Sequence, residues 1–164
     1  MFYSNIVFKG LEMSATTVTA LIGVVNFVAS FFGLVLLIFF GYRSLMLLFN
    51  ALMAASLILL ATFSFNHNTL GMVTCVLLFI VFFEFSSGTI VWIYNSEILQ
   101  DKAIGIATFL NMMIALAISV SIPLLVKKVA IGYIFLTFGI LTTIGTIFIA
   151  VFMVETRGKT QEEV

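Results

Sequence analysis

The sequence predicts an all-α membrane protein, a polytopic helical bundle, and three observations support this fold class. The 164 residues are 63% hydrophobic and only 9% charged, with a mean hydropathy of +1.29. Soluble domains are about 45–50% apolar and about 25% charged, so a soluble fold of this size could not bury the apolar excess. Uncharged stretches such as Phe31–Phe40 do not alternate apolar and polar residues, as the strands of a membrane barrel do.

The positions of the charged residues divide the chain into its predicted membrane spans. A helix rises 1.5 Å per residue and needs about 20 residues to cross a bilayer. The uncharged run 44–83 is therefore too long for one crossing, and we expect it to break in the polar cluster 64–69. Glu97, Asp101 and Lys102 mark a short predicted loop. The predicted spans cover about residues 16–40, 45–64, 70–93, 103–126 and 129–153.

The two ends of the chain and its domain organisation follow from the same pattern. The apolar residues 1–8 look like the end of a further helix, and the polar residues 154–164 form a predicted cytoplasmic tail. No linker or low-complexity tract interrupts the chain, so we expect one transmembrane domain over residues 1–164. Residues 1–10 do not read as a cleavable signal sequence.

Composition also argues against several classes of function. Seven basic residues balance seven acidic ones, so no positive field is available to attract nucleic acid. The sequence has one cysteine, Cys75, and one histidine, His67, which are too few ligands for the common Cys- and His-based metal sites. It also has no cofactor motif. No nucleophile–base pair or phosphate-binding loop is recognisable. We therefore expect neither an enzyme nor a cofactor-dependent protein.

Three stretches carry a more specific signal than membrane composition alone. The tail 154–164 reads V-E-T-R-G-K-T-Q-E-E-V, and residues 83–98 read F-E-F-S-S-G-T-I-V-W-I-Y-N-S-E-I. Gly41-Tyr42-Arg43 ends the first predicted span, in which Asn26 is an isolated amide. These stretches resemble the last helix, the tenth helix and the eighth helix with its turn in the sugar porters of the major facilitator superfamily. Asn111 falls where the eleventh helix of that family carries Asn or Gln.

The resemblance covers the whole chain, which is similar to the end of helix seven through helix twelve of a sugar porter. It implies half of a major-facilitator-type fold, from a protein that carries hexose or a related carbohydrate by facilitated diffusion or proton symport. Since the first six helices of the family have no counterpart here, we expect a truncated or fragmentary chain. The partners implied are the lipid bilayer, a sugar and the missing amino-terminal half, in the plasma membrane by analogy.

A second interpretation is a membrane component derived from a sugar porter that does not transport and docks on another membrane protein. The loss of family residues from the turn after helix eight favours it. A homodimer of half-carriers is a third interpretation, although an odd number of spans argues against it.

Four residues are implied by the resemblance to line the sugar path: Asn26, Glu84, Trp92 and Asn111. A charge at the bilayer centre costs about 2.5–3.5 kcal/mol on insertion scales, so Glu84 should face a cavity or a partner rather than lipid. An indole can stack on a pyranose, and amides can both donate to and accept from hydroxyls. The alternatives are a Glu that reaches the interface, an interfacial Trp, and amides that bridge helices.

A second group of charged residues lies at predicted helix ends and, by resemblance, forms a cytoplasmic gate: Arg43, Glu97, Glu155 and Arg157. Such networks close the inner side and open during transport. Ordinary boundary residues of membrane helices are the competing interpretation.

The tenth-helix motif departs from the family at its prolines, where Thr89 and Val91 stand instead. Proline breaks a helix and frees backbone carbonyls. Without proline, we expect this span to be a continuous helix that bends less readily.

Overall fold

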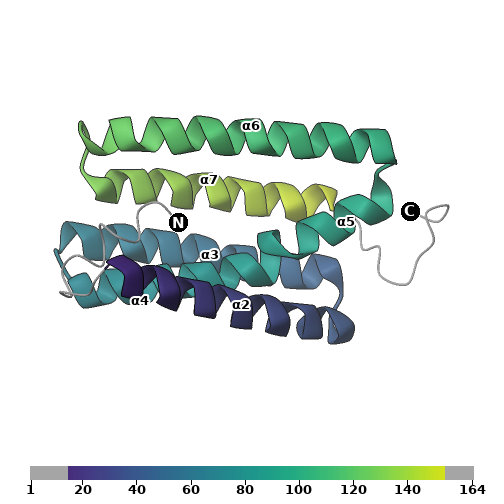
Figure 1. The fold of residues 1–164 in the computed structure, drawn as a ribbon, viewed down its shortest axis with the longest axis horizontal. Helices are drawn as coiled ribbons and strands as arrows, with labels where there is room; N and C mark the ends of the chain where they lie inside the picture. Colours follow the sequence, from purple (N-terminus) through teal and green to yellow (C-terminus); the bar gives the residue numbers. More distant parts are fainter. Residues whose placement is uncertain (1–14, 154–164) are drawn as a thin grey trace.

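The computed structural model describes residues 15–153, which form helices and no strand (Figure 1). Five candidate membrane spans result, because the third, Thr69–Ile98, consists of three consecutive elements. The predicted all-α polytopic fold is confirmed, while the expected partial helix at 1–8 and the tail at 154–164 lie outside the described residues. In chain order the elements are α2 (Ala15–Phe39), α3 (Tyr42–Phe65), α4 (Thr69–Phe83), the π-helical turn η2 (Glu84–Gly88), α5 (Ile90–Ile98), α6 (Asp101–Val126) and α7 (Ile131–Phe152).

A tight polar turn reverses the chain between α3 and α4. Asn68 caps α4, because its Oδ1 accepts from the backbone N–H of Gly71 at 3.0 Å. His67 adopts a left-handed conformation with φ of 52°, which a short reversal between two helices requires. At the end of α3, the backbone N–H of Asn66 donates a hydrogen bond to the carbonyl oxygen of Thr62. Polar side chains and backbone bonds thus end one span and begin the next.

Two expectations from the sequence are wrong. The third span is not a continuous α-helix, because a π-helical turn over Glu84–Gly88 separates α4 from α5 although proline is absent there. The predicted loop at Glu97, Asp101 and Lys102 is also shorter than expected. Glu97 lies inside α5, and α6 begins at Asp101, which leaves Leu99–Gln100 as the connection. An extended backbone at Leu99 and Gln100 suffices to reverse the chain.

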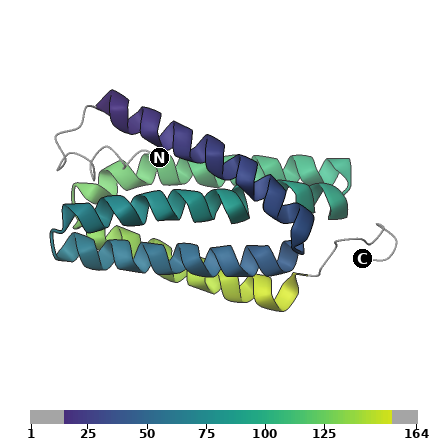
Figure 2. The same cartoon turned by 90° about the horizontal axis from the view of Figure 1, so that it is seen from below.

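Helix α3 is the centre of the packing. It lies along both α4 and α7, while α2 crosses obliquely and packs against η2 and α4 (Figure 2). Nine of the 24 residues of α3 are buried, and its most apolar stretch has the largest buried share of any span. One buried cluster joins α2, α3 and α4 through Ile22, Leu60, Val73, Cys75, Val76 and Ile80. A second joins α2, α3 and α5 to the end of α7 through Leu37, Leu45, Met46, Ile90 and Met153.

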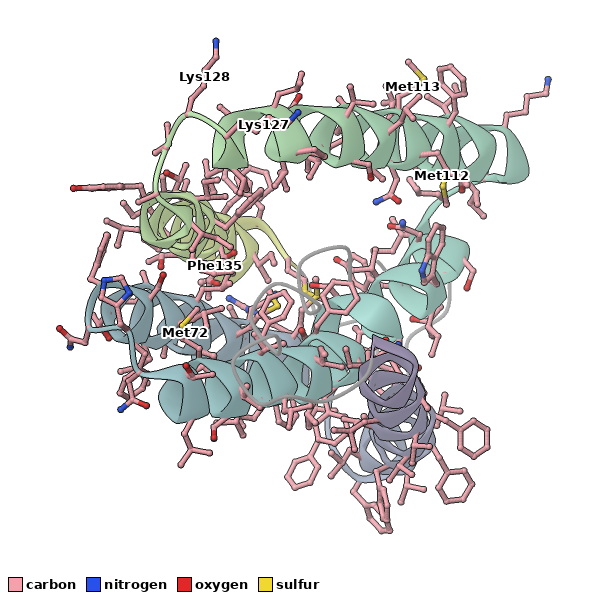
Figure 3. The ribbon with its side chains drawn as sticks, turned by 60° about the vertical axis from the view of Figure 1, so that its left-hand side comes forward. Met72, Met112, Met113, Lys127, Lys128 and Phe135 are labelled. Carbon is pink, nitrogen blue, oxygen red and sulfur yellow. The ribbon has the colours of Figure 1, made fainter. Side chains whose placement is uncertain are left out.

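Helix α6 is the exception, because no residue in its span Lys102–Val126 is buried among the described residues. It lies beside α7 but meets α5 and α7 at few positions. In Figure 3 Met112 lies on the side of α6 that faces the rest of the molecule and Met113 on the opposite side. Lys128, which follows α6, points away from the bundle in the same view. A long apolar face of α6 is therefore free to contact lipid or another helix.

The contact between α3 and α7 depends on a glycine. A Cβ atom at Gly139 would lie 3.0 Å from Cγ1 of Ile58 and 3.4 Å from Cβ of Leu57, whereas at Gly145 it would meet nothing within 4 Å. Small residues allow helices in lipid to approach closely, where dispersion forces replace the hydrophobic effect. Gly139 is thus one of two close approaches of α7 to α3 at a glycine; the other is Gly132, where a Cβ atom would lie 2.8 Å from Cε1 of Phe65.

We expect Gly139→Val to lower the stability of the detergent-solubilised chain by about 1–3 kcal/mol, the usual cost of overpacking. Gly145→Val is the matched control, since it makes the same change on the same helix in open space. Thermal unfolding followed by circular dichroism measures both. Equal shifts of the two midpoints would contradict a close α3–α7 contact at Gly139.

Candidate functional site

The polar side chains of the membrane interior gather around the π-helical turn η2. A π turn adds a residue to the helix and changes the direction of the side chains that follow it, and such turns occur often at functional sites. Helices α2 and α3, which precede η2 in the sequence, both pack against it. The site is therefore built from three segments: the middle of α2, the first half of α3, and the interruption between α4 and α5.

Glu84, the first residue of η2, is held against α2. Ser30 Oγ lies 2.9 Å from Glu84 Oε2 and also 2.9 Å from the backbone carbonyl oxygen of Asn26. A serine hydroxyl carries one proton, so it can donate to only one of these two acceptors at a time. The predicted acid thus has a specific polar partner, and it does not extend alone into lipid.

Gly88 provides the space for this carboxylate. A Cβ atom at Gly88 would lie 2.9 Å from Glu84 Oε2 and 3.2 Å from the carbonyl oxygen of Phe83. The side chain of Glu84 therefore folds back along the π turn and occupies the volume that any larger residue at position 88 would need. A larger residue at position 88 would have to displace this carboxylate and would press on the carbonyl oxygen of Phe83.

Asn26 lies one helical turn before Ser30 on α2 and is half-buried. Its side-chain oxygen Oδ1 is buried and has no hydrogen-bond partner among the residues that the structure describes. An unpaired buried acceptor costs about 1–3 kcal/mol, so such atoms normally meet a protein group, water or a ligand. Ser30, which the sequence analysis did not single out, lies between Glu84 Oε2 and the backbone carbonyl oxygen of Asn26.

The structure places Trp92 and Asn111 outside this hydrogen-bonded group. Trp92 lies on α5, beyond η2, and 43% of its surface is exposed. Asn111 lies on α6 and is exposed. Because α6 packs sparsely, the described residues bring neither Trp92 nor Asn111 against Glu84. Of the four residues expected to line one path, two therefore form a connected group.

Helix α3 supplies polar residues that sequence reasoning missed. Asn50 is buried, with 4% of its surface exposed, and its Oδ1 accepts from Ser87 Oγ at 3.2 Å. Ser86, which is fully buried, donates to the carbonyl oxygen of Phe82 at 2.9 Å. An amide in an otherwise apolar helix was a recognisable signal, since Asn26 and Asn111 were identified by that criterion. Its partners two helices away were not visible in the sequence.

Of the expected gate residues, Arg43 lies at the end of the bundle where α3 begins and α7 ends. Arg43 Nη2 donates to the backbone carbonyl oxygen of Ala150 at 2.7 Å, and thereby joins these two helices. The last carbonyls of a helix lack partners within the helix, and a guanidinium is a suitable donor for them. Glu97, near the end of α5, is half-buried. Glu155 and Arg157 lie outside the described residues.

No group of three or more His, Cys, Asp or Glu side chains able to hold a metal ion occurs within residues 15–153. The polar atoms around η2 are one carboxylate, two amides and several hydroxyls. These groups form hydrogen bonds to neutral, hydroxyl-rich molecules without needing a charged or metallic partner.

Comparison with known proteins shows what this arrangement resembles. The family model for sugar (and other) transporters matches residues 1–164. The facilitated trehalose transporter Tret1 of Drosophila erecta is 29% identical over 178 residues, which cover 100% of this chain and 21% of that protein. The glucose transporter GlcP of Staphylococcus epidermidis is 28% identical over 175 residues, which cover 100% of this chain and 39% of GlcP.

Solved structures share the fold. The inward-open xylose transporter XylE from E. coli superposes with a TM-score of 0.82 at 24% identity, over 87% of this chain and 34% of XylE. The proton:xylose symporter XylE bound to 6-bromo-6-deoxy-D-glucose gives a TM-score of 0.79 at 25% identity, over 99% of this chain and 37% of that one. The chain thus spans between about a fifth and two fifths of the length of these proteins.

The match over all 164 residues confirms the resemblance to sugar porters that the motifs indicated. Helices α2 to α7 correspond to a part of the major facilitator fold, in five membrane spans. This integral, multi-pass membrane chain belongs to the sugar transporter family.

Proposed function

We propose that the chain acts as the carboxy-terminal half of a transporter for a hexose or related carbohydrate. The rest of the transporter would come from the part of such a protein that this chain does not match. The observation that carries the proposal is the connected group of Asn26, Ser30 and Glu84 beside the π turn. Such a group offers an unpaired buried acceptor and a carboxylate to sugar hydroxyls, inside a span where both would otherwise be costly.

In this proposal Asn26 and Glu84 bind the sugar by hydrogen bonds, and Trp92 stacks on an apolar face of the ring. Asn111 joins the site when α6 is packed against the rest of the transporter. Arg43 and Glu97 act at the cytoplasmic gate with Glu155 and Arg157. The protein binds and releases its substrate unchanged, so no catalytic residue is assigned, and we place it in the plasma membrane by analogy with sugar porters.

Alternating access rocks two halves of a transporter about a site at their interface. The 164-residue chain reconstituted alone in proteoliposomes should therefore show no saturable uptake of radiolabelled glucose. Empty vesicles are the control for leakage. Saturable uptake that Trp92→Ala removes would show that the chain is a carrier without a second half.

The complementary test supplies the second half. We expect this chain, co-expressed with the part of GlcP that it does not match, to restore glucose uptake to cells that lack hexose transport. GlcP divided at the same position is the positive control for assembly. Trp92→Ala should reduce uptake efficiency about tenfold, a loss equivalent to about 1.4 kcal/mol, because a stacking surface is removed. Ile140→Ala, at an exposed position of α7, should change it little.

Facilitated diffusion is the mode of transport that we propose, since the acid that resemblance implies for proton coupling belongs to the half that this chain does not match. Uptake by the complemented pair should then persist when an ionophore collapses the proton gradient. Uptake that stops under this treatment, while the divided GlcP control continues, would favour proton symport instead.

A second candidate function is supported by the sparse packing of α6. In it, the chain docks on another membrane protein through this helix and carries no sugar. Failure of complementation, together with crosslinking of α6 to one unrelated membrane protein, would favour this interpretation. Restored uptake that depends on Trp92 would exclude it.

A further inference from the structure

The π turn over Glu84–Gly88 forms in a segment that has no proline but contains two serines and a glycine, residues that often accompany helix kinks. Two hydroxyls, one in the turn and one directly after it, donate to backbone carbonyls at the turn. Ser86 Oγ donates to the carbonyl oxygen of Phe82 at 2.9 Å, and Thr89 Oγ1 donates to that of Glu84 at 3.0 Å.

These local bonds satisfy the turn but do not connect it to the rest of the bundle. That connection comes from α3. Ser87 Oγ donates to Asn50 Oδ1 at 3.2 Å, across 37 positions of sequence. Ser86 Oγ lies farther from the same oxygen, at 3.5 Å, and its single proton is already engaged by Phe82. The bond between Ser87 and Asn50 is therefore the principal polar link between α3 and the turn.

The π turn is in fact held from two sides. On the α2 side, Ser30 meets Glu84 at 2.9 Å, and on the α3 side, Asn50 meets Ser87. Between them Phe85 packs edge-on against Phe49 of α3, with ring centroids 5.0 Å apart. Asn50 is buried, so water cannot replace this bond if it breaks. An unpaired amide and hydroxyl would then remain in an apolar environment.

We propose that Asn50 is a positioning residue of the sugar site. Through Ser87 it holds the π turn, and the turn fixes where Glu84 and Trp92 lie relative to each other. Asn50 does not contact sugar itself, because it is buried behind the turn. This role rests on the proposed function for its purpose, but its structural effect can be measured without any sugar.

The test uses the 164-residue chain in lipid nanodiscs. We expect Asn50→Leu to speed hydrogen exchange of the amides of residues 84–90 about tenfold, the effect of losing one buried hydrogen bond of ordinary strength. Exchange in α7 should stay unchanged. Trp92 is the single tryptophan, so its fluorescence is an independent reporter, and its quenching by acrylamide should increase.

Ser87→Ala removes the same bond from its other end and should reproduce both changes, whether or not Asn50→Leu folds. Ser87→Thr retains the hydroxyl and should restore slow exchange and weak quenching. Ser56→Ala is the matched control, because Ser56 is a buried residue of α3, also 4% exposed, whose hydroxyl donates to Leu52 of its own helix. It should affect neither signal.

Unchanged exchange and quenching in Ser87→Ala would overturn the proposal. Changes that spread over the whole chain, or that Ser56→Ala matches, would also overturn it, because they would indicate a general loss of packing. The outcome is independent of the transport assays. If Trp92 responds as expected and complementation with GlcP fails, the positioning role stands and the proposed function does not.

Discussion

The absence of water from the bilayer core is the constraint on which the rest of this structure depends. A backbone or side-chain polar group in hydrocarbon must find its partner inside the protein or remain unpaired at a cost of several kcal/mol. Continuous helices meet this requirement over most of the chain. Where the helix widens at Glu84–Gly88, the hydroxyls of Ser86 and Thr89 donate to the backbone carbonyl oxygens of Phe82 and Glu84. The polar side chains of the interruption thus find partners inside the protein.

The same constraint explains why the polar residues form a group. Isolated hydroxyls elsewhere in the spans, such as Thr142 and Thr146, donate to carbonyls of their own helix and need nothing from a neighbour. A carboxylate or an amide has more hydrogen-bonding capacity than one local carbonyl can meet. Glu84 and Asn50 therefore depend on side chains from other helices. Asn26 differs from them, because its buried side-chain oxygen has no hydrogen-bond partner among the described residues.

Much of the fold was predictable from the sequence because lipid imposes a simple rule on length and polarity. Uncharged runs of sufficient length gave five spans, and α2 to α7 supply five. The π turn was not predictable in this way. The pattern suggested that a span without proline would be continuous, whereas the turn depends on Ser87 meeting Asn50 from another helix. Glu84 was identified through its motif, and the structure adds that its carboxylate occupies the space beside Gly88.

The candidate site was predicted less completely, for a physical reason. Composition and resemblance can identify which residues are polar within a span, but the partner of each depends on how helices are rotated and packed. Ser30 lies on the same face of α2 as Asn26, four residues away, yet only the approach of η2 gives it a role. Trp92 lies on α5 and Asn111 lies on α6. The distance between them depends on how α6 packs, and α6 is the helix with the fewest neighbours.

The connections at the two ends of α6 have a consequence for assembly. The short links Leu99–Gln100 and 127–130 tether this helix at both ends, so it cannot leave the bundle even where it makes few contacts. It can still turn about its own axis or tilt at little cost, because the alternative neighbour on most of its surface is lipid. A helix arriving from elsewhere would compete only with hydrocarbon chains for that surface, and it would find α6 already inserted at a high local concentration. In the proposed assembly, a partner helix would therefore exchange lipid for protein along α6, beside helices that are already packed.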